Sequence, residues 1–379
     1  MTESRDDVSP LGWTPVWAMP NVTLDEAIEA SHAALVPCSD RRLCAIAGRR
    51  PALKTFLEAF RDEFGTPILP TVAMFRGDAP DGVRTDTAIG GLRDAVCVSA
   101  IVAGWSMQSA NGTIIHSDAF DVYPWFVGLH DHLGAVTPAM VGIHNVEKLQ
   151  AQSAPALGRR HLSTTGMDRP LLDAILVRWR CCFVDGDDST KNLRLFRSLE
   201  MARAASKRPG GSDATQYDVG RAVALWVSAF EILAHDGRHA DFGRVLSLLD
   251  RVRWLRQPFK VRDRTVIYRQ QSIPTNLAGV IYERLYRARN DFLHGNPVSD
   301  ETLRLERCRQ SALHFAAPLF RLALTAALDL TFSEDAANPE GYGRHIGRRM
   351  DFRAPQRFAE DAILVADEPP KKRTSAATA

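Results

Sequence analysis

The segment LYRARNDFLHGNP, residues 285–297, ends in three side chains whose types suit chemistry at a phosphodiester. Asn290 and His294 are four residues apart and would share one face of a helix, while Arg289 is rotated from Asn290 by about 100°. An imidazole with a pKa near neutrality accepts or donates a proton at physiological pH. A guanidinium can hold two phosphoryl oxygens and stabilise the charge that grows on them. Arginine and histidine together therefore suffice for RNA cleavage without a metal ion.

One imidazole can hardly serve as acid and base at once, so this chemistry implies two copies of the motif. Five residues of helix span about 7.5 Å, which would let Arg289 and His294 flank one phosphate. Two chains facing each other would supply a second histidine, and we therefore expect a homodimer with a shared cleft.

The spacing alone is weak evidence. With 11 His and about 40 Arg in the chain, an arginine five residues before a histidine is expected roughly once by accident. A second instance does occur, at Arg309 and His314 in RQSALH. His314 precedes the apolar run FAAPLF, and we predict that it lies on a helix face inside a bundle.

The elements that would position the motif lie in the second half of the chain, where long helical patterns dominate. The candidates are LLDAILVRWRCCF, TKNLRLFRSLEMARAAS, YDVGRAVALWVSAFEILAHDG, FGRVLSLLDRVRWL, TNLAGVIYERLYRARNDFLHG and ETLRLERCRQSALHFAAPLFRLALTAALDL. Thr275 and Asn276 are cap candidates at the start of the motif helix, and Gly295 would end it. We predict an all-α bundle of about five to six helices over residues 170–332.

The first half mixes patterns and predicts an α+β domain of unknown role over residues 21–150. LDEAIEASHAAL and PALKTFLEAFRDEF are expected to be helical, and TVAMF, GTIIHS and FDVYPWF to be strands. GLRDAVCVSAIVAGWS could be a helix or a strand. Residues 1–20 are predicted to form a loosely docked N-terminal arm, 151–169 a linker, and 333–379 a polar, disordered tail. The whole chain is expected to be predominantly α.

Two helical segments resemble a known family. DVGRAVALWVSAFEILAHDG and IYERLYRARNDFLHGNPV are similar to the helical core of the HEPN superfamily, and most closely to the Apea-like HEPN domain, over residues 170–332. That family carries an arginine, a polar residue and a histidine in the order R-polar-x3-His, usually followed by glycine. The matching residues are Arg289, Asn290, His294 and Gly295, and the upstream LW..A.E.L pattern is matched by Leu225, Trp226, Ala229, Glu231 and Leu233.

The resemblance implies a dimeric, metal-independent endoribonuclease without a cofactor, of a kind often found as a toxin or in antiviral defence against phage. It also implies an alternative, because many such domains only dimerise and bind nucleotides, RNA or partners. In that case the N-terminal domain would sense a ligand or a phage or host protein. Glu231 would orient His294 or pair with Arg289, or form a salt bridge that positions helices. Tyr286 would line the cleft or pack in the core.

A basic stretch, RVRWLRQPFKVRDRTVIYRQ at residues 251–270, contains one acidic residue, Asp263, and interleaved aromatic residues. Basic groups that follow phosphates and rings that stack on bases are what single-stranded RNA binding uses. Charge runs are also often solvated surface. The predicted RNA-binding residues are Arg253, Trp254, Arg256, Lys260, Arg262 and Arg264, in a long, irregular insertion.

Bulk properties exclude other classes. The net charge is +2, unlike that of a generally basic nucleic-acid binder. We see no secretory signal, and the longest apolar runs fall short of the roughly 18 residues of a membrane span, so we expect a cytoplasmic protein with no membrane partner. His130 and His132 have no third candidate ligand at a sequence spacing typical of metal sites, so no metal site is predicted. NTPase, dinucleotide and hydrolase motifs are absent.

Overall fold

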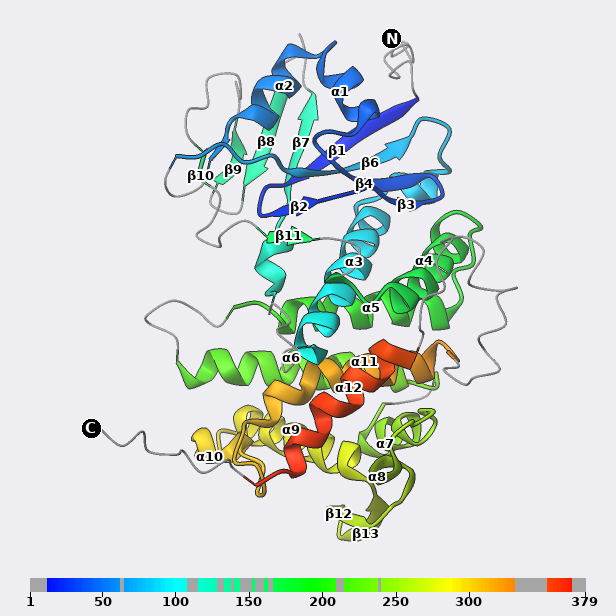
Figure 1. Ribbon diagram of the computed structural model, residues 1–379, viewed down its shortest axis with the longest axis vertical. Coiled ribbons are helices and arrows are strands. Elements are labelled where there is room, and N and C mark those ends of the chain that lie inside the picture. Colours follow the sequence, from blue (N-terminus) through cyan, green and yellow to red (C-terminus); the bar gives the residue numbers. More distant parts are fainter. Residues whose placement is uncertain are drawn as a thin grey trace, which may run out of the picture. The chain divides into compact units, whose positions relative to one another are not determined.

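The computed structural model describes residues 12–61, 65–107, 115–127, 133–137, 140–143, 152–153, 160–162, 166–208, 215–237, 240–330 and 353–369. Helix predominates over strand, and the chain divides into two compact units (Figure 1). Unit 1 comprises Met1–Ala100 and Ile115–Arg203, and unit 2 comprises Ile101–Ile114 and Ala204–Ala379. The expectation of an α+β protein with predominant helix is confirmed at this coarse level.

Unit 1 is built on a seven-stranded antiparallel sheet in the order β3-β4-β6-β1-β7-β8-β9. Its strands are β1 (Trp13–Met19), β3 (Ile28–Ala30), β4 (Ala33–Pro37), β6 (Thr71–Arg76), β7 (Tyr123–Val127), β8 (Leu133–Thr137) and β9 (Met140–Ile143). Helices α1 (Arg41–Ala47) and α2 (Pro51–Glu58) pack on the sheet through Leu43, Ile46 and Phe56, which are buried against Val36 and Val72. The helix predicted for PALKTFLEAFRDEF is confirmed over Pro51–Glu58, whereas Phe60 and Arg61 form a strand and residues 62–64 lie outside the described residues. The strands predicted at TVAMF and FDVYPWF are confirmed, the second from Tyr123 onward.

Two expectations for the first half were wrong, and a third is tested only over residues 115–117. Residues 13–19 of the supposed arm form the central strand β1, with Ala18 and Met19 buried; residues 1–11 lie outside the described residues. LDEAIEASHAAL forms a strand hairpin rather than a helix, because Ile28 and Ala30 alternate with the exposed Glu29. The described part of GTIIHS contains no strand.

The supposed linker belongs to unit 1 and pairs with the rest of it through two short parallel strands. These are β10 (Gln152–Ser153) with β5 (Phe60–Arg61), and β11 (Arg160–Leu162) with β2 (Val22–Leu24). Most of the other residues between 151 and 169 lie outside the described part of the chain. The 3-10 helices η1 (Asp81–Arg84) and η3 (Ser117–Phe120) complete the short elements of unit 1.

The boundary between the units differs from the predicted one, because α4 (Arg169–Phe183) and α5 (Thr190–Ala205) group with unit 1. They pack against α3 (Asp86–Ser106), the segment left open between helix and strand. The Trp179 indole N–H donates to the Ala88 carbonyl at 2.7 Å, and a Cβ at Gly91 would meet the Phe196 ring at 3.1 Å. Within the described residues α3 is the one helix long and apolar enough to cross a bilayer, but 83% of its apolar window is buried in the fold. This is typical of the core helix of a soluble protein, and the cytoplasmic location stays a prediction.

Unit 2 is a helical bundle with one β-hairpin. Its elements are α6 (Gln216–Ala234), α7 (Phe242–Asp250), α8 (Gln257–Lys260), β12 (Arg264–Tyr268), β13 (Gln271–Thr275), α9 (Leu277–His294), α10 (Asp300–Leu303), η7 (Ala312–Phe315), α11 (Ala316–Ala327), α12 (Arg353–Leu364) and η9 (Val365–Asp367). Helices α6, α7, α9 and α11 contact one another (Figure 1). Their core includes the rings of Phe230, Phe242, Tyr282 and Phe320, with Phe230 and Phe320 centroids 5.3 Å apart.

Two sequence expectations for unit 2 need correction. Residues 301–330 do not form one helix, because Arg309 adopts a left-handed φ of 59° and Arg304 bridges to Ser311, which separates α10 from α11. The insertion is not irregular either, since residues 264–275 form an antiparallel hairpin. Arg269 and Gln270 at its turn both have positive φ, as a tight hairpin turn requires.

The tail prediction was also wrong in part, since residues 353–367 form α12 and η9. Ala359 and Ile363 of α12 are buried, and so are the polar residues Gln356 and Glu360. The Arg321 side chain of α11 is fully buried and donates to the Gln356 amide oxygen. Because a buried guanidinium needs a polar partner, the tail helix completes the fold of unit 2. The remaining tail residues lie outside the described part of the chain.

Candidate functional site

Helix α9 positions the predicted motif, and both of its ends are fixed by caps. The Asn276 side chain accepts from the backbone N–H groups of Ala278 at 3.0 Å and Gly279 at 3.3 Å. At the other end Gly295 has a φ of 71°, in the left-handed conformation that glycine adopts without strain, and its N–H donates to the Asp291 carbonyl. The predicted cap at Asn276 and the predicted end after His294 are confirmed.

Arg289 faces helix α6 within the bundle. Its Nη2 donates to the Glu231 Oε1 at 2.9 Å, and both side chains are 18% exposed. The guanidinium carbon lies 4.8 Å from the centre of the Tyr286 ring, within range of a cation–π interaction. Of the roles considered for Glu231, the structure has the ion pair with Arg289.

Buried polar groups surround this ion pair. Burial raises the pKa of the Glu231 carboxyl, and the charge of Arg289 acts in the opposite direction. Burial and then the charge of Glu231 hold the pKa of Tyr282 well above its ordinary value. Neither the Tyr282 hydroxyl nor the Arg289 Nε has a hydrogen-bond partner among the described residues. The pair therefore holds the guanidinium at a fixed place in a half-buried setting.

Tyr286 belongs to an aromatic cluster rather than to an open cleft. Its ring lies 5.1 Å from Phe242 and 6.0 Å from Tyr268, measured between centroids. Tyr286 is half-buried, so of the two roles considered for it, packing is the one with visible contacts.

His294 is the last residue of α9 and is exposed, and Asn290 is half-buried one turn earlier. Five residues of helix rotate His294 from Arg289 by about 140°. His294 makes no hydrogen bond or ion pair to any described residue. Within one chain the structure therefore places Asn290 and His294 on one face and Arg289 on another.

The second instance of the spacing lies in a different setting. Arg309 is in a turn and His314 is in η7. His314 is exposed, with its ring centroid 6.0 Å from that of Trp105, so the prediction that it lies inside the bundle was wrong.

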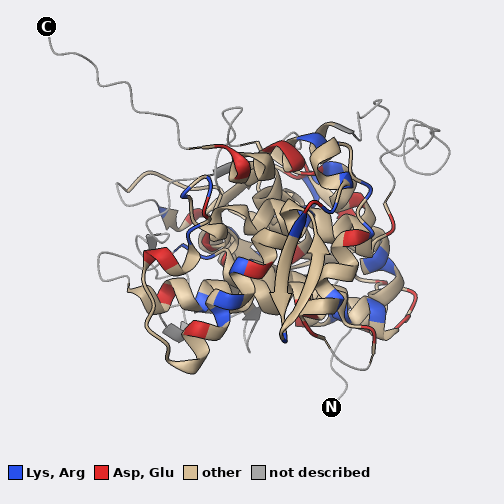
Figure 2. Ribbon diagram, turned by 90° about the horizontal axis from the view of Figure 1, so that it is seen from below, with Lys and Arg blue, Asp and Glu red and all other residues tan. Residues whose placement is uncertain are grey.

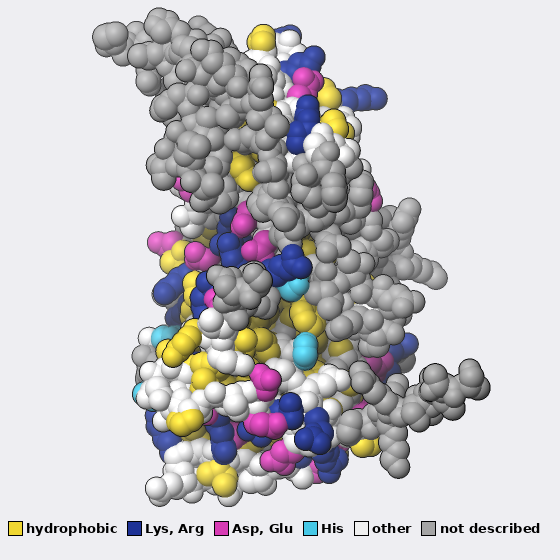
Figure 3. All heavy atoms as spheres, turned by 90° about the vertical axis from the view of Figure 1, so that its left-hand side faces the viewer, with side chains coloured by type: hydrophobic (Ala, Val, Ile, Leu, Met, Phe, Trp, Pro, Cys, Tyr) yellow, Lys and Arg dark blue, Asp and Glu magenta, His cyan; other side chains and the backbone are white. Residues whose placement is uncertain are grey.

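The predicted RNA-binding stretch is largely occupied by ion pairs. Arg256 binds Asp361 through two nitrogens, at 2.8 and 2.7 Å. Arg262 pairs with Asp250 at 2.9 Å, and Arg264 pairs with Asp367 at 2.8 Å. Over the described residues as a whole, basic and acidic segments are interspersed in the view of Figure 2, and the face drawn in Figure 3 carries both kinds of charged side chain.

The other three residues predicted to contact RNA are placed differently. Arg253 and Lys260 are exposed. Trp254 stacks on Phe259, with centroids 4.6 Å apart and planes at 16°, so one face of the indole is already covered. Half of the predicted residues therefore have carboxylate partners, and two offer an unobstructed positive charge.

Sequence reasoning missed the acidic residues of α12 and η9, because the segment was assigned to a disordered tail. The signal was the spacing of Ala359, Ile363 and Ala366 in RFAEDAILVA, which are four and three residues apart. It also missed a charged cavity in unit 2 that Arg264 helps to line.

Metal ligands and relatives give no further assignment. No group of three or more His, Cys, Asp or Glu side chains that could hold a metal ion occurs within the described ranges. The pair His130 and His132 lies outside them. Compared with known proteins, the chain matches no family model, no curated protein and no solved structure.

Proposed function

We propose that this chain is a metal-independent endoribonuclease of HEPN type that acts as a homodimer. The observation that carries the proposal is the exposed imidazole of His294 at a glycine-capped helix end, one turn from Asn290 on the same face. Arg289 supports the proposal because its guanidinium has a fixed position, set by the ion pair with Glu231 and the cation–π contact with Tyr286. A toxin or phage-defence role is the setting we infer from the resemblance.

The proposed reaction is transesterification at phosphorus. One His294 removes the proton of the 2′-hydroxyl, the 2′ oxygen attacks the adjacent phosphorus, and the bond to the 5′ oxygen breaks. The partner subunit's His294 gives a proton to the leaving 5′ oxygen. Arg289, which lies on another face of α9 than the His294 of its own chain, stabilises the charge on the non-bridging oxygens within the shared cleft of the dimer, and Asn290 orients the groups by hydrogen bonding. A dimer is required because each imidazole starts in one protonation state only.

The test compares purified wild type with His294→Ala on single-stranded RNA and tRNA in EDTA. We expect wild type to cleave and the variant to lose about a hundredfold or more in rate, the usual contribution of a general acid or base. His314→Ala is the matched control, because this histidine is also exposed and also follows an arginine by five residues. Cleavage that His294→Ala leaves unchanged would refute the proposal, and so would a strictly monomeric active protein in sedimentation.

A second candidate is a non-catalytic dimerisation and binding module, with a sensing role for the N-terminal unit. The half-buried ion pair of Arg289 with Glu231 favours it, because a guanidinium already bound to a carboxylate is less available to a phosphate. The same assay separates the two. Wild type that is inert on every RNA tested, and harmless on overexpression, would favour the module.

A further inference from the structure

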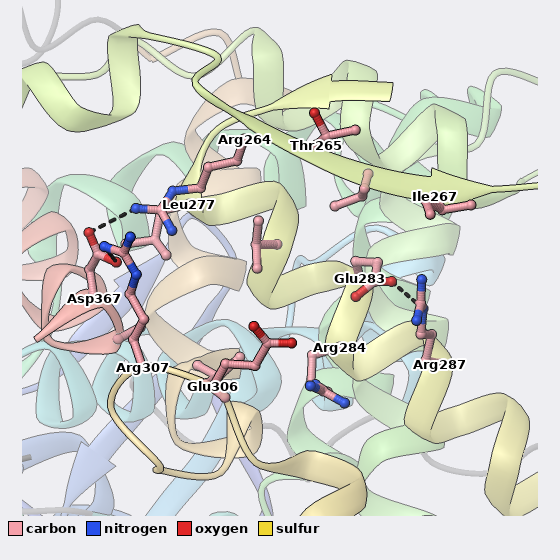
Figure 4. A pocket seen from close by; sticks show the side chains of 14 residues that line it. Arg264, Thr265, Ile267, Leu277, Glu283, Arg284, Arg287, Glu306, Arg307 and Asp367 are labelled. Atoms are coloured by element: carbon pink, nitrogen blue, oxygen red, sulfur yellow. Dashed lines mark hydrogen bonds and ion pairs between the residues drawn. The ribbon is translucent and has the colours of Figure 1, made fainter. Parts of the chain in front are cut away.

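A charged cavity of about 360 Å³ lies in unit 2 between β12, α9, the segment that follows α10, and η9 (Figure 4). Apolar side chains such as Leu277 and Val280 line it together with charged groups. Its four arginines come from three separate segments of the chain and are Arg264, Arg284, Arg287 and Arg307. A cavity of this size is within the range of ligand sites, and its charged lining suits a charged ligand.

The Asp367 carboxylate already forms ion pairs with two of these arginines. Asp367 Oδ2 accepts from Arg264 at 2.8 Å, and Asp367 Oδ1 accepts from Arg307 at 2.8 Å. Two guanidinium groups that converge on two oxygens of one anion are how arginines hold phosphate oxygens. Asp367 therefore stands where an anionic group of a ligand would bind.

Asp367 can leave this place without loss of α12. It belongs to η9, the short turn after α12, and is 29% exposed. Helix α12 itself is held by Glu360, which accepts from the Leu255 N–H at 2.9 Å, and by the buried Gln356. Movement of the Asp367 side chain alone would thus remove the carboxylate that Arg264 and Arg307 share, and Arg264 would keep only the longer contact with Asp263, at 3.7 Å.

The other two cavity arginines connect the cavity with His294. Arg284 and Arg287 are three residues apart on α9, and Arg284 makes no hydrogen bond to a described residue, while Arg287 pairs with Glu283 and is 54% exposed. Arg287, Asn290 and His294 follow one another at three and four residues. They share one face of α9 over about 10 Å. The arginine on the histidine's face is therefore Arg287, not Arg289.

We propose that the backbone of a single-stranded RNA binds across this cavity and along the face of α9 from Arg287 to His294, and that it displaces Asp367. This inference rests on the proposed function for its ligand class, and it adds the residues that hold the strand and the acidic group that competes with it. The cavity lining has four guanidinium groups against three carboxylates, Glu283, Glu306 and Asp367. Release of Asp367 leaves four against two and makes the site suitable for a polyanion.

Binding is measured with a short labelled single-stranded RNA in the His294→Ala background, so that cleavage does not interfere. Asp367→Asn is expected to tighten binding roughly fivefold. The slope of log affinity against log salt concentration should change little, because RNA that displaces Asp367 contacts the same two arginines in the wild type and in the variant. Arg284→Gln and Arg287→Gln are each expected to weaken binding roughly fivefold.

The matched control is Asp329→Asn. It removes the same charge and takes from Arg251 a carboxylate partner at 3.1 Å, while Arg251 keeps its hydrogen bond to the Ala326 carbonyl. Asp329 does not line the cavity. Asp329→Asn should leave the affinity for RNA nearly unchanged. When Asp367→Asn is combined with Arg307→Gln, the tighter binding expected of Asp367→Asn should disappear. Thermal unfolding of each variant confirms that the fold persists.

The outcomes separate the inference from the proposed function. Equal effects of Asp329→Asn and Asp367→Asn, or no effect of Asp367→Asn, would overturn the inference even if wild type cleaves RNA. Tighter binding by Asp367→Asn alone would support it even if wild type proves inert as a nuclease.

Discussion

Removal of the Arg289 guanidinium should destabilise unit 2 by an amount set by its half-buried environment. Arg289→Met keeps most of the side-chain stem and leaves the Glu231 carboxylate without its 2.9 Å partner. Breaking a fully buried ion pair costs about 3–5 kcal/mol, while an exposed pair is worth about 1 kcal/mol or less. With both side chains 18% exposed, we expect an intermediate loss of about 2 kcal/mol in the free energy of unfolding.

The pH dependence of this loss identifies its cause. Burial already raises the pKa of Glu231, and removal of Arg289 takes away the charge that opposes the rise. An acid whose folded pKa lies above its unfolded value of about 4.3 binds more protons when folded, so its burial penalty is complete above the folded pKa and disappears below the unfolded one. The deficit of Arg289→Met should thus be full at about pH 8 and shrink towards about pH 4.

Urea unfolding of a double-mutant cycle with Glu231→Gln measures the coupling directly. We expect about 1.5 kcal/mol or more, since hydrogen bonds between charged groups contribute about that much. The control cycle uses Arg221 and Asp218, a pair separated by 4.0 Å with side chains 59% and 31% exposed. A coupling no larger than in this control, or a deficit that does not change with pH, would show that the pair does not hold the guanidinium as argued.

Three further predictions concern single residues. Gly220→Ala should cost about 1–3 kcal/mol in urea unfolding, because its Cβ would lie 2.4 Å from the Phe292 ring. Gly295→Ala should cost about 1 kcal/mol in the free energy of unfolding, because Gly295 has a φ of 71° and alanine is strained there although the space around it is open. Gly295→Asn is the control, because asparagine adopts this left-handed conformation more readily, and equal losses for the two variants would contradict the strain argument. Asp40→Asn should lower stability at neutral pH, because hydrogen bonds from Arg42 lower the pKa of Asp40. That contribution is present above about pH 4 and is lost as pH falls through the lowered pKa, so the stabilities of wild type and variant should converge in acid.

Helix α9 could be predicted from the sequence because its determinants are local. Asn276 caps its start, Gly295 ends it in a left-handed conformation, and its apolar face follows the helical period. The same holds for α2 and α6, which begin with a proline and a capping box, respectively. Local signals of this kind do not depend on the rest of the chain.

The elements that were missed depend on distant partners. Glu29 and its neighbours favour a helix by composition, yet β3 pairs with β4, and β4 pairs with β6 about forty residues away. Helix α12 is required by the fully buried Arg321, which needs Gln356 from 35 residues further along the chain. Neither contact can be read from a sequence window.

The candidate site shows the same division. The helical period places Asn290 and His294 on one face of α9, which the sequence predicted. The direction of the Arg289 side chain depends on Glu231 of α6, which is 58 residues away in the chain. The sequence therefore left the ion pair between them as one of several possible roles of Glu231. The spacing in the sequence thus determines which residues share a face of α9, and the neighbouring helix α6 determines which of them form contacts within the bundle.

Counting charges along the chain misled most at the basic segment, and the reason bears on function. Arg256 and Arg264 find their carboxylates 105 and 103 residues away, in the helix and turn that the sequence assigned to a disordered tail. A basic stretch is electropositive only to the extent that its counter-charges lie elsewhere. If RNA binds this surface, it must therefore compete with the chain's own acidic segment, and its affinity should depend on salt and on Asp367 together. If the affinity for RNA depended on net charge alone, Asp367→Asn and Asp329→Asn would change it equally, since each removes one negative charge.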